Sequence, residues 1–191
     1  LGGSGSGTSI TVSGEDATLA EAVSQKCLPS VVNIDVYTKQ SSQTMMGMMG
    51  QTSDELEESS LGSGIILSSD GYILTNYHVI EGADQLKVNA GGEEYIAQVV
   101  GTDESSDLAV LKIDASGLTA IEIGSSSDLT VGEWVMAVGS PFGLEQSVST
   151  GIVSATSRTT SALNDSSSGS SAVYTNMIQT DAAINPGNSG G

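Results

Sequence analysis

The sequence is poor in the side chains that build disulfides and metal sites. It holds a single cysteine and a single histidine in 191 residues. Cys27 therefore has no partner for an intrachain disulfide, and neither a cysteine-based metal cluster nor a structural zinc site is expected. The apolar residues around Cys27 predict a small buried side chain rather than a reactive thiol.

Basic residues and long apolar runs are also scarce. The chain has 5 Lys and Arg residues against 23 Asp and Glu residues, which gives a formal net charge of −18. Such a polyanion is repelled by nucleic acid and by anionic lipid, so neither is expected as a partner. No apolar run approaches the roughly 18 residues of a membrane-spanning helix, so we predict no membrane insertion by this chain.

The N-terminal part of the sequence changes character after residue 15. Residues 1–15 are rich in Gly and Ser and lack the basic end and apolar centre of a signal peptide, so they are expected to form a flexible segment. A short helix is predicted over residues 16–27, because Asp16 or Thr18 can cap its start and Pro29 follows its end.

The remainder of the chain predicts almost only β structure. Many short apolar or alternating runs, separated by turn residues, are typical of barrels or of a sandwich. A first series of strands is expected at 31–37, 64–67, 72–76, 85–88, 95–100 and 108–113. After a connector at 116–119, a second series is expected at 120–123, 133–138, 146–155 and 173–180.

Two stretches between these strands are predicted to be mobile loops. Residues 38–60 contain a methionine cluster at 45–49, which forms either an adaptable contact surface or a solvated insertion. Residues 159–171 are rich in serine, a composition typical of a flexible connection.

The most informative local pattern lies at residues 185–191, Asn-Pro-Gly-Asn-Ser-Gly-Gly. A serine flanked by glycines can occupy a tight turn in which its hydroxyl and nearby backbone N–H groups face one point. This geometry suits a serine whose hydroxyl attacks a carbonyl, because the nearby backbone N–H groups can then stabilise the resulting oxyanion. Taken alone, the pattern is more typical of an ordinary glycine-rich loop.

Two further residues give the serine its chemical context. His78 follows an apolar strand, and histidine is the usual general base because it changes charge near neutral pH. Asp107 opens the apolar run 107–113, where it either caps a turn or pairs with a specific partner. Asp103 lies nearby in the sequence, so the pattern alone does not decide which aspartate pairs with the histidine. The order His78, Asp107, Ser189 is the order of chymotrypsin-type triads.

With these residues in place, the chain resembles the protease domain of the HtrA (high-temperature-requirement) family of serine endopeptidases. The matching segments are 62–66, 71–80, 107–112, 124–129, 131–143, 151–155 and 178–191, within an overall match to residues 29–191. The resemblance implies an all-β, chymotrypsin/trypsin-like double β-barrel with a short N-terminal helix. Residues 16–118 would hold the helix and first barrel, and residues 119–191 the second barrel.

The resemblance also implies roles for the candidate residues. His78 would act as general base and then general acid, Asp107 would orient it, and Ser189 would be the nucleophile. The oxyanion hole is expected in the backbone of Gly187, Asn188 and Ser189, with the N–H groups of the first and last as donors. No cofactor is expected, because this chemistry needs none.

Two more expectations concern specificity and regulation. Ile184 matches a position that lines the primary specificity pocket, and an apolar residue there argues against cleavage after Lys or Arg. Asn188 replaces the aspartate that pairs with a newly cut N-terminus in digestive relatives, so activation by clipping is not expected. Ordering of loops, including residues 38–60, is the expected form of regulation.

Members of this family cut unfolded or damaged proteins outside the cytoplasm, often as homotrimers, and a peptide-binding PDZ module commonly follows the protease domain. A complete domain of this type continues through further strands after the nucleophile, so the second barrel is expected to be incomplete in this chain. Two alternatives stay open: a chaperone-like binder of unfolded polypeptide, or an inactive fragment that needs the missing strands.

Overall fold

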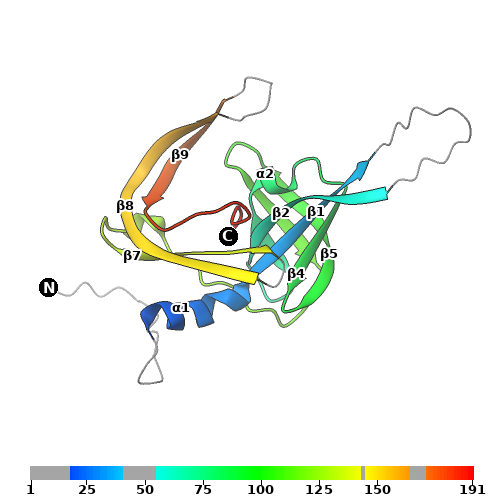
Figure 1. Cartoon of the computed structure of the whole chain (residues 1–191), viewed down its shortest axis with the longest axis horizontal. Helices are drawn as coiled ribbons and strands as arrows, with labels where there is room; N and C mark the ends of the chain where they lie inside the picture. The colour runs from blue at the N-terminus through cyan, green and yellow to red at the C-terminus, as the bar shows by residue number, and fades with distance from the viewer. Residues whose placement is uncertain (1–17, 41–54, 143–144, 164–170) are drawn as a thin grey trace, which may run out of the picture.

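The computed structural model describes residues 18–40, 55–142, 145–163 and 171–191. It shows a closed barrel beside an open sheet, with a helix near the N-terminus and the C-terminal loop between the two β parts (Figure 1). The predicted flexible segment 1–15 and the methionine cluster at 45–49 lie outside the described residues.

The predicted N-terminal helix is confirmed as α1 (Leu19–Cys27). The Thr18 hydroxyl accepts a hydrogen bond from the Glu21 N–H, and the Glu21 carboxylate accepts one from the Thr18 N–H. This capping box satisfies donors that the first turn leaves unpaired. The helix runs into the 3₁₀ turn η1 (Leu28–Ser30), where Pro29 ends the α-helical hydrogen bonding. No helix in the described part of the chain is long and apolar enough to cross a membrane.

Six antiparallel strands close the first barrel in the order β1-β2-β3-β6-β5-β4. The short helix α2 (Tyr77–Ile80) follows β3. All six strands of the first expected series are present. Their bounds are β1 (Val31–Gln40), β2 (Glu55–Ile66), β3 (Tyr72–Thr75), β4 (Gln85–Ala90), β5 (Glu93–Asp103) and β6 (Leu108–Ile113).

The loop expected at 38–60 is wrong at both of its ends. Residues 38–40 pair with residues 55–57 and extend β1 and β2 into a projecting hairpin. The sequence gives little sign of it, because residues 55–60 are exposed and lack the apolar alternation of a strand with one buried face.

The core of the barrel follows the two-residue period of its strands. Val32, Ile34 and Val36 of β1 are at most 2% exposed, because alternate side chains of a strand point to the same face. They belong to one core cluster with fully buried side chains of the other strands. These are Ile66, Ile73, Val88, Leu111 and Ile113.

A second sheet has the order β7-β8-β9, with bounds β7 (Trp134–Phe142), β8 (Glu145–Leu163) and β9 (Ser171–Thr180). The strand expected at 120–123 is wrong. Its one backbone bond to the barrel runs from the Ile121 N–H to the Ile66 carbonyl, and Ile123 is 79% exposed. The loop expected at 159–171 is also shorter than predicted, because both flanking strands extend into it.

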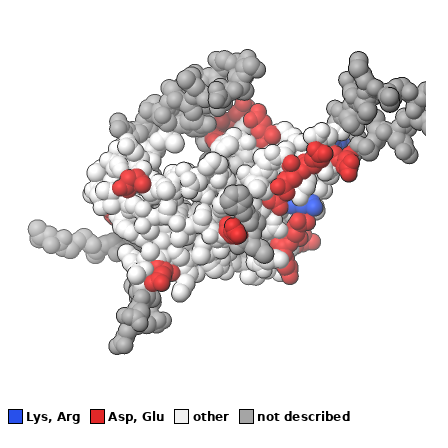
Figure 2. Space-filling model, in the orientation of Figure 1, with Lys and Arg blue, Asp and Glu red and all other residues white. Residues whose placement is uncertain are grey.

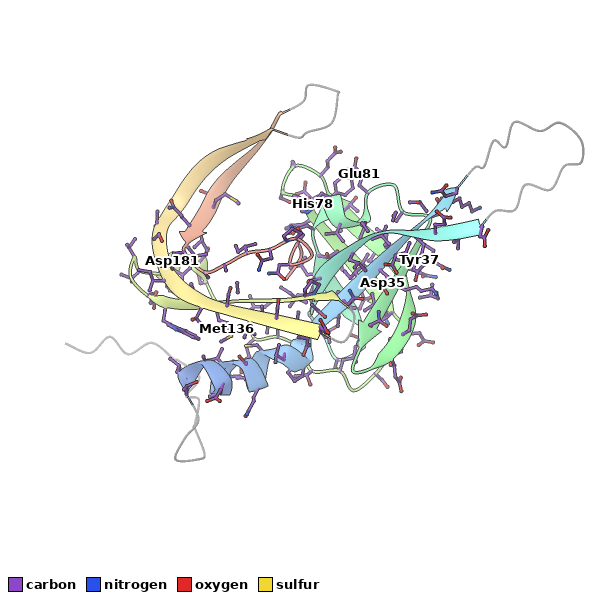
Figure 3. The ribbon with its side chains drawn as sticks, viewed as in Figure 1. Asp35, Tyr37, His78, Glu81, Met136 and Asp181 are labelled. Atoms are coloured by element: carbon purple, nitrogen blue, oxygen red, sulfur yellow. The ribbon has the colours of Figure 1, made fainter. Side chains whose placement is uncertain are left out.

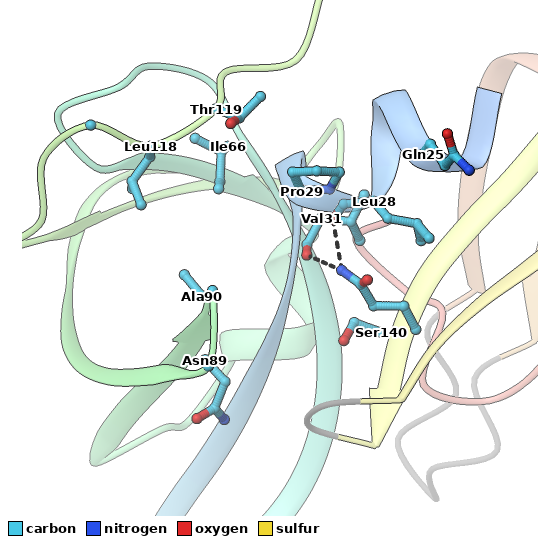
Figure 4. A pocket seen from close by; sticks show the side chains of 14 residues that line it. Gln25, Leu28, Pro29, Val31, Ile66, Asn89, Ala90, Leu118, Thr119 and Ser140 are labelled. Carbon is cyan, nitrogen blue, oxygen red and sulfur yellow. Dashed lines mark hydrogen bonds between the residues drawn. The ribbon is translucent and has the colours of Figure 1, made fainter. Parts of the chain in front are cut away.

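Side-chain amides tie the two β parts together. The Gln146 amide on β8 donates to the carbonyls of Leu28 and Val31, and the Asn33 amide on β1 donates to the carbonyl of Ser140 on β7. A cavity of about 540 Å³ lies at this junction, between η1, the end of the barrel and the β7–β8 hairpin (Figure 4). None of the predicted site residues lines it.

The barrel core yields a stability prediction. We expect Leu111→Ala to lower the free energy of unfolding by about 2–5 kcal/mol, because it leaves a cavity among fully buried neighbours. The matched change Ile96→Ala, at a side chain that is 55% exposed, should cost less than about 1 kcal/mol. Urea denaturation measures both. Equal losses would contradict the assignment of Leu111 to the core.

Candidate active site

His78 lies on α2, which begins directly after β3 (Figure 3). Its side chain is 50% exposed, whereas the next two residues, Val79 and Ile80, are buried against the barrel core. The helix is therefore anchored by its apolar residues and presents the imidazole at the surface.

Asp107 makes two separate hydrogen bonds to this histidine. One carboxylate oxygen accepts the His78 backbone N–H at 2.8 Å, and the other lies 2.6 Å from His78 Nδ1. The Asp107 carbonyl also accepts from the Asn76 amide and from the Tyr77 N–H. With Nδ1 engaged, Nε2 is the ring nitrogen left to exchange a proton with a nucleophile.

The backbone of Asp107 is in the left-handed region, with φ of 56°. This conformation is uncommon outside glycine and carries a cost, although aspartate tolerates it better than most residues. The bonds that Asp107 accepts from residues 76–78 hold it there. Its side chain is only 13% exposed, so the pairing with His78 is partly shielded from water.

The neighbouring Asp103 has a structural role in the turn between β5 and β6. Its carboxylate accepts from the hydroxyl and N–H of Ser105 and from the Ser106 N–H, and so closes the turn between β5 and β6. Hydrogen bonds from these two serines lower the pKa of Asp103. Of the two aspartates that the sequence offered, Asp107 is the one in contact with His78.

Ser189 lies in a loop made of two consecutive β-turns. The Asn188 N–H donates to the Asn185 carbonyl, and the Gly191 N–H donates to the Asn188 carbonyl. The third residue of each turn is a glycine with positive φ, 91° at Gly187 and 92° at Gly190. These are the features of type II turns, in which only glycine fits the third position without strain.

The turn type decides where the amide between Pro186 and Gly187 points. Type I and type II turns differ in ψ of the second residue and in φ of the third, each by roughly 150–170°. The peptide between these two residues is therefore flipped, and its N–H points to opposite sides in the two turn types. The N–H groups of Gly187 and Ser189 donate to no acceptor among the described residues, whereas that of Asn188 is used within the turn. The N–H groups of Gly187 and Ser189 are therefore available to bind an oxyanion.

Ser63 on β2 joins this loop to the first barrel, and sequence reasoning assigned it no role. Its N–H donates to the Ser189 carbonyl and its hydroxyl to the Gly187 carbonyl, each at 2.8 Å. The same hydroxyl accepts the Ser140 N–H from β7. Ser63 is 0% exposed, so these bonds are shielded from water. The only signal in the sequence was the small-residue run 62–64.

Gly62 shows that Ser189 and the histidine helix are neighbours. A Cβ placed on Gly62 would lie 2.5 Å from Val79 Cγ1 and 3.4 Å from the Ser189 carbonyl oxygen. The residue after His78 and the backbone of Ser189 thus meet across one glycine. The structure shows no hydrogen bond between the Ser189 hydroxyl and the His78 ring within its described residues.

The other two predicted residues lie on the same loop. The Asn188 side-chain oxygen accepts a hydrogen bond from the Ser147 hydroxyl on β8, a neutral contact in place of an ion pair. Ile184 is 68% exposed, and the adjacent Ala183 carbonyl is held by the Ser149 hydroxyl. Within the described residues, no group of three or more His, Cys, Asp or Glu side chains could hold a metal ion.

The fold and this arrangement are those of a trypsin-like serine peptidase domain, and comparisons with known proteins agree. The trypsin-like peptidase domain family matches residues 62–191. A probable periplasmic serine endoprotease of DegP-like type from Halomonas elongata is 54% identical over 136 residues, which cover 71% of this chain and 27% of that protein. The corresponding protein of a Marinomonas species is 44% identical over 194 residues, or 87% of this chain and 39% of that protein.

A solved structure, the HtrA-type protease AlgW with a tripeptide, is similar with a TM-score of 0.66 and 44% sequence identity. The match covers 87% of this chain and 47% of that structure. The chain belongs to the family of trypsin-like peptidases, and its relatives confirm the predicted HtrA type and double-barrel fold class. It spans 27% of the Halomonas relative and 39% of the Marinomonas one.

The turn at Gly187 yields a prediction about catalysis. A Cβ at this position would lie 2.5 Å from Pro141 Cβ, on a backbone with φ of 91°. We expect Gly187→Ala to rotate the amide between Pro186 and Gly187 and to lower kcat by about 10²–10³-fold, as loss of one oxyanion donor does. Peptide hydrolysis kinetics measure the effect.

Gly92→Ala is the matched control for backbone strain. Gly92 has φ of 83°, but a Cβ there would meet nothing within 4 Å. It should lose stability while kcat stays within about twofold of wild type. A Gly187→Ala protein with wild-type kcat would show that this turn does not present the oxyanion donor.

Proposed function

We propose that this protein hydrolyses peptide bonds as a serine endopeptidase, through an acyl-enzyme formed on Ser189. The main support for the proposal is that Asp107 makes hydrogen bonds to both the backbone N–H and the ring of His78. On the same side of the barrel, Ser63 makes a hydrogen bond to the Ser189 loop. An aspartate that fixes both the backbone and the ring of one histidine leaves Nε2 as a preorganised base.

In this proposal His78 Nε2 takes the proton of the Ser189 hydroxyl as its oxygen attacks the substrate carbonyl carbon. The oxyanion is stabilised by the N–H groups of Gly187 and Ser189. The carbon–nitrogen bond then breaks, and His78 gives its proton to the leaving amine. A water molecule, deprotonated by His78, releases the acyl group and restores the Ser189 hydroxyl. Over the cycle the proton from Ser189 ends on the released amine, a proton from the water replaces it, and His78 and Ser189 regain their starting protonation states.

The proposed substrates are unfolded or damaged proteins outside the cytoplasm. The DegP-like relatives are named periplasmic, which supports an extracytoplasmic setting. The exposed, apolar Ile184 supports cleavage after small or branched aliphatic residues, because an apolar pocket offers no partner to a Lys or Arg side chain. A homotrimer and a PDZ module elsewhere in the protein complete the proposal, on the strength of the family alone.

The direct test is labelling with a fluorophosphonate, followed by intact mass. We expect one adduct on the wild-type protein and none on Ser189→Ala. Asp107→Asn should keep the fold but slow peptide hydrolysis by about 10⁴-fold, because the amide no longer selects the productive histidine tautomer.

Each outcome separates this proposal from a chaperone-like role. Lack of an adduct on folded wild-type protein would contradict an assembled triad. If wild type and Ser189→Ala both retain an unfolded protein and neither cleaves it, binding without hydrolysis is the function. An adduct together with cleavage that Ser189→Ala abolishes supports the peptidase.

A further inference from the structure

One edge of β2 next to the nucleophile is open. β2 pairs with β1 along residues 55–65, but its other edge meets β3 only at Ile65 and Ile66. Ser63 donates its N–H from this open edge to the Ser189 carbonyl. Because the direction of backbone groups repeats every second residue, Leu61 presents its N–H and C=O to the same edge. An extended peptide can add a strand there.

A groove of about 360 Å³ accompanies this edge. Residues 58–61 of β2 line one side of it, and Pro141, Pro186 and Gly187 line the other. The groove therefore adjoins the turn whose N–H group would hold the oxyanion. Among the described residues that line the groove, Glu58 is the only charged one.

A β-bulge directs Glu58 into this position. Ser60 lies opposite Val36 and Glu58 lies opposite Tyr37, so Ser59 is an extra residue in β2. The Ser59 hydroxyl donates to the Val36 carbonyl and fixes the bulge. Val36 points into the barrel core, whereas its neighbour Tyr37 is on the outer face. Without the extra residue Glu58 would share the inner face with Ser60, and with it Glu58 shares the outer face with Tyr37.

The charge of Glu58 is not neutralised within the described part of the chain, where no ion pair involves it. Lys87, a cation on the same outer face, pairs with Glu94 at 3.2 Å and lies over the Tyr37 ring. Figure 2 shows acidic side chains gathered along this part of the β1–β2 hairpin. A basic side chain that enters the groove would therefore meet an unpaired carboxylate.

The chemistry of the proposed reaction says which half of the substrate reaches this groove. His78 must deliver its proton to the leaving amine, so the segment after the scissile bond begins beside the histidine. The helix that carries His78 contacts β2 at Gly62 through Val79. Ile184, the proposed pocket residue for the acyl half, is absent from the groove lining. The leaving half thus lies along β2.

Resting on the peptidase activity proposed above and on a leaving segment that lies along β2, we propose that Glu58 selects a basic side chain in that segment. Glu58 lies 5 residues before Ser63, a separation of roughly 16 Å at 3.3 Å per residue. A long Lys or Arg side chain two to four residues beyond the scissile bond spans the remaining distance.

The test uses quenched fluorescent peptides that share one acyl half, ending in valine, and carry Lys, Ala or Glu at the second, third or fourth residue after the bond. For wild-type protein we expect kcat/KM to fall in the order Lys, Ala, Glu, by about two- to fivefold a step, the size of an exposed ion pair. The preference should shrink in about 0.5 M NaCl, because exposed charges are screened.

Glu58→Gln should give all three peptides the same kcat/KM. Glu57→Gln is the matched control, because it removes the same charge from the next residue, which lies opposite Thr38 on the other face of the strand. Glu57→Gln should keep the wild-type preference. Equal rates for the three peptides on wild type, or equal loss of preference in both variants, would overturn the proposal.

Fluorophosphonate labelling of the same samples separates the two proposals. An adduct on Ser189 with no preference among the peptides would remove the role of Glu58 and leave the peptidase intact. Absence of both adduct and cleavage would remove the peptidase itself, and the role of Glu58 with it.

Discussion

The hydrogen bonds of one buried serine connect the two halves of the candidate active site. His78 and Asp107 belong to the first barrel, whereas Ser189 arrives on a loop that follows the second sheet. Ser63 bonds to two carbonyls of that loop and accepts an N–H from β7. Since a buried hydrogen bond is costly to leave unmade, this contact sets the position of the serine relative to the histidine.

Glycines allow the close approach that these bonds require. A Cβ on Gly190 would overlap the Ser63 carbonyl oxygen and the Thr75 hydroxyl, and a Cβ on Gly62 would press into Val79. The run of small residues at 62–64 and the glycines around Ser189 are thus two sides of one interface. The same β2 strand then continues past the interface as the open edge beside the oxyanion turn.

The sequence predicted the parts of this site that depend on residue type and order. A single histidine, an aspartate at the start of an apolar run and a serine between glycines are distinctive when they occur together in this order. The strands of the first barrel were predictable for a related reason, since Val32, Ile34 and Val36 alternate with polar residues as one buried face demands.

What the sequence could not predict depends on contacts between distant segments. The ends of the hairpin at residues 38–40 and 55–60 form through backbone pairing, and because residues 55–60 are exposed they carry no apolar pattern. Residues 120–123 carry such a pattern but make one backbone bond to the barrel and form no strand. The bulge at Ser59 and the bonds of Ser63 to the Ser189 loop and to β7 are likewise set by tertiary contacts.

The most direct test of the link between the two halves is the rate at which a fluorophosphonate labels Ser63→Ala. The change removes the hydroxyl that donates to the Gly187 carbonyl and accepts from the Ser140 N–H, a loss of about 1–3 kcal/mol. We expect labelling of Ser189 to slow about tenfold or more in protein that urea denaturation shows to be folded. Ser105→Ala, which removes a hydroxyl bond in the exposed β5–β6 turn, should label at the wild-type rate. A wild-type rate in Ser63→Ala would contradict the claim that this serine aligns the catalytic loop.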